Sequence, residues 1–218
     1  MTAVSFFKKW CIGILVLSCV LYAWVLSRTQ SVYIGKSFYF LVCATEHVEA
    51  DTLDIRLDGG AGYPLQDTGV ALAVYLKAEE GLAVQTGLAE QGQELSLIKR
   101  SVEYLHFKTR ADKNNASLYT GALDSLYGFL QVLSGEITRL DKGATQQSTK
   151  RTLQTLSRLF SYHKEEYERA YPAYARLCES VEGQFKELTA DTVFVNDLRY
   201  LLCELAVGYL ELAEEFSI

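Results

Sequence analysis

The stretch GGAGYPLQDTGVALAVYLKAEEGLAVQTGLAEQGQELSLIKRSVEYLHF, residues 59–107, decides the fold that we predict. Residues 70–76 alternate with a period of two, which is typical of a strand, and Tyr75 falls on the face opposite the valines and leucines. A polar start at 77–80 with acidic residues in its first turn predicts a helix over 77–89. Residues 95–107 are expected to be extended again. Strand, helix and strand at this spacing predict a split βαβ unit, half of a ferredoxin-like sandwich.

The same stretch resembles a SPOR-type domain. The resemblance rests on GGAGY, on the apolar strand that ends in an aromatic residue, and on the polar, acidic helix start. It is similar to the divergent version found in membrane-anchored sporulation proteins such as stage II sporulation protein B. It covers about residues 37–107 if the strand predicted at 38–43 supplies the first β element, and Gly81 departs from the family's usual helix-favouring Ala. The resemblance implies a domain that binds peptidoglycan glycan strands on the sheet face that helices leave uncovered.

Three tyrosines are the candidate glycan contacts under this resemblance. The strand parity makes Tyr75 the first candidate, and Tyr39 and Tyr63 follow because their register relative to Tyr75 is not fixed by the sequence. Ordinary packing of the sheet is the alternative for all three rings. Basic or polar residues among the aromatic ones would favour glycan binding, whereas Ala71 and Ala73 beside Tyr75 predict a bare face.

Residues 10–26 form an uncharged apolar run of 17 residues near the N-terminus. A helix rises about 1.5 Å per residue, so this run just reaches across a hydrocarbon core of about 30 Å. Lys8 and Lys9 precede it, which places residues 1–9 in the cytoplasm and the bulk of the chain outside. We therefore predict a single-pass anchor at 10–27 in the cell membrane. Two alternatives stay open, a cleaved signal peptide and lipidation at Cys19.

The remaining chain divides into a linker at 28–36, a SPOR-like α/β sandwich at 37–110 and a helical bundle at 111–218. In the last part apolar residues recur every three or four positions over 118–140, 145–188 and 191–216, which predicts an antiparallel bundle. Pro172 should kink or split the second run. The expected fold class is α+β, with an N-terminal transmembrane helix, a small ferredoxin-like sandwich and an all-α antiparallel bundle.

The charge of the chain argues against a nucleic-acid partner. The formal net charge is −6, and leaving out Lys8, Lys9 and Arg28 gives 18 basic and 27 acidic residues, a net charge of −9 for residues 29–218. A region this acidic repels phosphate backbones. Length allows one or two small domains, and the apolar content of 49% is typical of folded chains.

No catalytic motif is found in the sequence. The histidines, His47, His106 and His163, stand far apart and form no HxxxH or HExxH pair, and neither GxSxG nor a P-loop occurs. We therefore expect a protein that is not an enzyme and has no metal or cofactor. Cys178 and Cys203 are on the second and third helical runs, where they could form a disulfide or remain buried thiols.

Two classes of function are compatible with these features. The first is a membrane-anchored extracytoplasmic protein of the bacterial cell envelope, non-catalytic, whose SPOR-like domain binds peptidoglycan in sporulation or division. The second is a structural scaffold whose helical bundle docks an envelope protein and whose SPOR-like domain no longer binds glycan. The expected partners are thus the membrane, peptidoglycan and a protein of the envelope.

Overall fold

A computed structural model describes residues 17–21, 30–43, 60–66, 68–190 and 192–216 of the chain. Its strands are β1 (Gln30–Cys43), β2 (Tyr63–Leu65), β3 (Gly69–Tyr75) and β4 (Ser96–Phe107), and they form one antiparallel sheet in the order β2-β3-β1-β4. Helix α3 (Ala78–Ala89) connects β3 to β4, with β1 between these two strands. This connection is a split βαβ unit.

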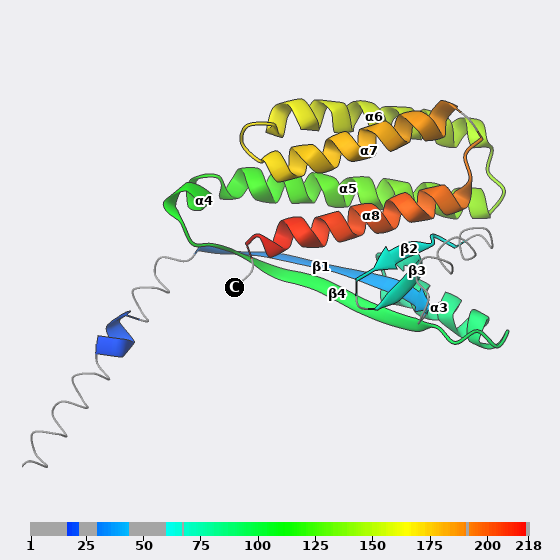
Figure 1. The fold of residues 1–218 in the computed structure, drawn as a ribbon, viewed down its shortest axis with the longest axis horizontal. Helices are drawn as coiled ribbons and strands as arrows, with labels where there is room; N and C mark the ends of the chain where they lie inside the picture. The colour runs from blue at the N-terminus through cyan, green and yellow to red at the C-terminus, as the bar shows by residue number, and fades with distance from the viewer. Residues whose placement is uncertain (1–16, 22–29, 44–59, 67, 191, 217–218) are drawn as a thin grey trace, which may run out of the picture.

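The chain continues after β4 as a series of helices that cover one face of the sheet. They are α4 (Arg110–Asn114), α5 (Ala116–Asp141), α6 (Gln146–Tyr167), α7 (Pro172–Ala190) and α8 (Val195–Glu214). Helices α5 and α8 lie next to the sheet, and α6 and α7 form an outer layer against them, while α3 packs on the opposite face (Figure 1).

The sheet and the helices share one apolar core. Phe38 of β1 is fully buried, and its ring lies 5.2 Å from Tyr209 of α8 and 6.1 Å from Tyr127 of α5. Buried side chains from β1, β3, β4 and all the long helices after β4 join the same cluster. The two parts that the sequence indicates, 37–110 and 111–218, are therefore packed directly against each other.

The predicted fold class is wrong in its first element, the transmembrane helix. Of the predicted anchor at 10–27, only residues 17–21 belong to the described part, where they form a short helix. No described helix is long and apolar enough to cross a membrane. The chain is an α+β protein with a four-stranded antiparallel sheet.

Several element boundaries differ from the predictions for identifiable reasons. Strand β1 begins at Gln30, inside the predicted linker, because residues 30–33 pair with 104–107 of β4. The split expected at Pro172 is confirmed, since α6 ends at Tyr167 and α7 begins at Pro172, which has no N–H to continue a helix. The helices predicted over 118–140 and 191–216 are confirmed as α5 and α8.

Candidate functional site

One face of the β1–β4 ribbon carries polar and aromatic side chains together. Tyr39 of β1 lies between two cross-strand neighbours, Tyr75 on β3 and Lys99 on β4. In the adjoining row Ser37 lies opposite Ser101. We call Ser37, Tyr39, Lys99 and Ser101 the open face. Lys99 and Ser101 are exposed to solvent, and Ser37 and Tyr39 are half-buried.

The orientation of the open face follows from the alternation of side chains along β1. Phe38 and Phe40 are fully buried, and Phe38 packs against α5 and α8. Successive side chains of a strand point to opposite faces, so Ser37 and Tyr39 point away from these helices. Helix α3 covers only one end of that side of the sheet, and the β1–β4 ribbon extends beyond it (Figure 1).

Tyr75 borders the open face at the end covered by α3. A Cβ atom added to Gly81 of α3 would lie 3.2 Å from Cδ2 of Tyr75 and 2.9 Å from Cδ1 of Leu97. Gly81, the buried residue of α3, is therefore a position at which the helix backbone closely approaches the Tyr75 ring. Burial raises the pKa of Tyr75, and the Arg199 guanidinium partly opposes this shift.

Tyr63 lies on the other face of the sheet. It pairs with Ala71 of β3, and its ring packs against Tyr200 of α8 with a centroid distance of 5.1 Å. Burial, followed by the nearby Glu204 carboxylate, raises the pKa of Tyr63. The structure thus brings Tyr39 and Tyr75 together and separates Tyr63 from both.

An irregularity in β3 changes the composition of the open face. Leu41 pairs with Ala73, but Val42 pairs with Ala71, so Leu72 is an extra residue on β3. The extra residue reverses the alternation of side chains between the two faces of β3. Ala71 therefore points toward the helices and belongs to the buried core. The predicted bare face with both alanines beside Tyr75 is therefore wrong. Only Ala73 shares the side of the sheet on which Tyr75 lies.

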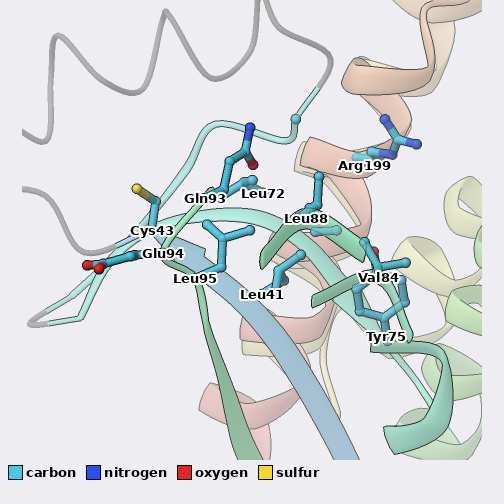
Figure 2. A pocket seen from close by; sticks show the side chains of 12 residues that line it. Leu41, Cys43, Leu72, Tyr75, Val84, Leu88, Gln93, Glu94, Leu95 and Arg199 are labelled. Atoms are coloured by element: carbon cyan, nitrogen blue, oxygen red, sulfur yellow. The ribbon is translucent and has the colours of Figure 1, made fainter. Parts of the chain in front are cut away.

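A pocket of about 500 Å³ adjoins Tyr75 where α3 meets the sheet (Figure 2). Arg199, Gln93 and Glu94 supply its polar side chains, and Arg199 forms an ion pair with Asp141, with 2.9 Å between Nη2 and Oδ2. Most of the remaining lining is aliphatic: Leu41, Leu72, Ala73, Val84, Leu88 and Leu95. This lining is suited to apolar contacts and offers few hydrogen-bond donors to a polar ligand.

The two histidines that the structure describes lie in different parts of the fold. His106 Nδ1 is 2.8 Å from Ser31 Oγ on the β1–β4 ribbon, whereas His163 Nδ1 is 3.0 Å from the Tyr174 hydroxyl inside the bundle. His47 lies outside the described residues. Within the described ranges no group of three or more His, Cys, Asp or Glu side chains could hold a metal ion.

Cys178 of α7 and Cys203 of α8 are buried free thiols. Burial raises the pKa of Cys178 to about 12 and also raises that of Cys203. Both side chains therefore remain thiols at neutral pH, and neither has the thiolate character of a nucleophile.

A second aromatic pair on the ribbon was not predicted from the sequence. Tyr33 and Tyr104 are 68% and 47% exposed, and their ring centroids are 5.2 Å apart. The Tyr33 ring lies over Gly35, whose φ is +59° and where a Cβ atom would collide with the ring. The pairing of residues 30–33 with β4 is the signal that would have revealed this pair.

Comparison of the chain with family models, curated proteins and solved structures returned no match. The resemblance of residues 37–107 to SPOR-type domains therefore stays a prediction.

Proposed function

We propose that this protein is a non-catalytic binding module of the bacterial cell envelope that binds peptidoglycan glycan strands on its open face, in sporulation or division. The observation that carries the proposal is the register that places Tyr39 between Tyr75 and Lys99. The flat, apolar ring of a tyrosine suits the apolar face of a sugar ring, and its hydroxyl group can form a hydrogen bond at the edge. Lys99, Ser37 and Ser101 add hydrogen-bond donors for sugar hydroxyl and acetamido groups beside that ring.

The charge of the protein predicts which form of glycan it prefers. The chain carries a formal net charge of −6, and the stem peptides of peptidoglycan carry carboxylates. Like charges repel, so stem peptides should weaken the encounter with the acidic protein, whereas the stripped glycan backbone avoids this repulsion. Amidase treatment, which removes the stem peptides, should therefore strengthen binding.

Co-sedimentation of the full chain with purified sacculi tests the proposal, with and without amidase treatment. We expect pelleting to increase on stripped sacculi. Tyr39→Ala should weaken binding about fivefold, the loss expected for an aromatic contact of about 1 kcal/mol. Tyr162→Ala is the matched control because Tyr162 is 60% exposed on α6, in the outer helical layer. No pelleting by a folded protein, or equal losses in both variants, would contradict the proposal.

A second candidate function is a scaffold whose bundle docks a protein of the envelope. Leu159 and Tyr162 of α6 are 40% and 60% exposed, and residues three apart on a helix lie on the same face. A photo-crosslinker placed at position 162 in cells would then yield one defined protein adduct. Binding to stripped sacculi that depends on Tyr39, without such an adduct, would instead favour glycan binding.

A further inference from the structure

Among the described residues, no strand pairs with the outer edge of β4. β4 is the last strand of the described sheet, with β1 on its inner side, and it extends over 12 residues. At His106 the backbone N–H donates a 2.8 Å hydrogen bond to the carbonyl oxygen of Phe216. A backbone hydrogen-bonding group on the outer edge of β4 thus already has a partner at this one position. Edge strands with open hydrogen-bonding groups readily add a further strand.

There is room beside this edge for a second strand. Residues 100–104 of β4, together with Leu210 and Glu214 of α8, line an open depression of about 730 Å³. Lys99, Ser101 and Glu103 of β4 are exposed. The depression therefore adjoins the segment of β4 that precedes the bond to Phe216.

We propose that a second copy of this chain occupies the edge, with the two β4 strands paired antiparallel about a two-fold axis at Ser101. The pairing would join the two sheets into one continuous sheet of eight strands. This interface goes beyond the proposed glycan binding and does not depend on it. An isologous contact of this kind requires a surface that is complementary to itself.

The charges of β4 select this register. Residues that face each other across an antiparallel pair have their side chains on the same side of the sheet. A two-fold axis perpendicular to the sheet therefore has to lie between one residue of β4 and the same residue of the second copy. With the axis at Ser101, Lys99 faces Glu103 of the second copy on both sides of the axis. An axis at Arg100 would oppose two guanidinium groups, and an axis at Glu103 would oppose two carboxylates. An axis at Val102 gives no pair of opposite charges.

The helical side of the sheet is compatible with the same register. Arg100 lies opposite Phe38, whose side chain packs against α5 and α8, so Arg100 lies on the helical side. In the dimer Arg100 of the second copy faces Val102, beside the depression that Glu214 lines. A cation is thus placed next to an exposed carboxylate of α8.

Cysteine cross-linking of the full chain tests the register. The protein is kept in a mild detergent because residues 10–26 are apolar and uncharged. Ser101→Cys should form a covalent dimer under mild oxidation, since the axis brings the two copies of position 101 face to face. Ser37→Cys is the matched control, because position 37 lies one strand further in, about 14 Å from its copy. It should cross-link no more than the wild type, whose own cysteines, the exposed Cys19 included, set the background.

Charge exchange at the same edge tests the interaction itself. Glu103→Lys should raise the dimer dissociation constant about tenfold or more in sedimentation analysis, because Lys99 then faces a like charge. Adding Lys99→Glu to Glu103→Lys should restore dimerisation, since the exchanged charges are opposite again. A monomeric wild type, a dimer insensitive to Glu103→Lys, or cross-linking at position 37 instead of 101 would overturn the proposal.

Discussion

At the scale of single residues, Gly81 sets the distance between α3 and the sheet. We predict that Gly81→Ala lowers the free energy of unfolding by about 1 kcal/mol or more, because strain against Tyr75 and Leu97 exceeds the gain in helix propensity. Gly87→Ala in the same helix is the control, since nothing lies within 4 Å of its added Cβ atom. It should raise the free energy of unfolding by up to about 1 kcal/mol. Urea denaturation measures the free energy of unfolding of both variants. Equal stabilisation by Gly81→Ala and Gly87→Ala would contradict a close contact at Gly81.

Two buried tyrosines should respond oppositely to loss of their hydroxyl groups. The Tyr171 hydroxyl donates a 3.1 Å hydrogen bond to the carbonyl oxygen of Leu212, whereas the buried Tyr209 hydroxyl has no hydrogen-bond partner among the described residues. Tyr171→Phe should therefore cost about 1 kcal/mol of stability. Tyr209→Phe should stabilise the protein by about 1 kcal/mol, because it removes an unpaired polar group from the core. Thermal or urea unfolding of both variants gives the comparison, and destabilisation by Tyr209→Phe would refute it.

The residues of the candidate site could be predicted only in part. Tyr75 was selected from strand parity, whereas the register of Tyr39 and Tyr63 was left open, and the structure places only Tyr39 opposite Tyr75. Lys99 and Ser101 could not be assigned to the same face, because nothing local in the sequence fixes the pairing of β1 with a strand some 60 residues later. The bulge at Leu72 could not be predicted from the sequence either, because a bulge is defined by the pairing with the neighbouring strand.

At the scale of elements, the contact between α6 and α7 depends on an uncharged histidine. His163 of α6 stacks on Tyr167 at 5.6 Å and lies 3.0 Å from the Tyr174 hydroxyl of α7. Burial lowers the pKa of His163, and the Glu166 carboxylate partly opposes this shift. Protonation therefore favours the unfolded chain, in which the imidazole has a pKa of about 6.5.

The pH dependence of stability tests this contact. The contribution of His163 is fully present above about pH 6.5 and is lost as the pH falls through the unfolded value toward the lower folded pKa. We predict that the wild type loses more stability between about pH 7.5 and 5.5 than His163→Gln, which lacks the titrating group. Urea denaturation at both values measures the difference. Parallel losses in the two proteins would show that His163 does not titrate differently on folding.

The elements themselves were more predictable than their ends. Apolar residues three and four apart mark α5 and α8 within a few residues, because each helix buries one stripe. Pro172 marks the break between α6 and α7 directly. The first half of β1 was missed because residues 30–36 have a largely exposed, weakly apolar pattern, and only their pairing with 102–107 reveals them as strand.

At the scale of the whole molecule, the arrangement of sheet and bundle determines which surfaces are available. Helices α5 and α8 cover one face of the sheet, α3 covers one end of the other, and the open face lies beyond α3 (Figure 1). The sequence indicates the sheet and the helices as separate parts, but burial of Phe38 between Tyr127 and Tyr209 joins them in one core. Such long-range packing leaves no local signal in either part.

If two copies join along β4, their open faces lie on the same side of one continuous sheet. Because the two-fold axis reverses the direction of the second site, two glycan strands that run antiparallel in one sacculus could bind the two copies at once, which would add avidity without any new contact. This consequence links the dimer to glycan binding, although each is tested separately.

The most direct measurement is a titration of the isotope-labelled full chain with stem-peptide-free glycan strands, followed through backbone amide chemical shifts. Binding on the open face predicts the largest changes at Ser37, Tyr39, Lys99 and Ser101. Tyr63 and Tyr200 on the covered face should change little, because the sheet lies between them and a ligand on the open face. Changes confined to α6, or no change at saturating glycan, would contradict the account.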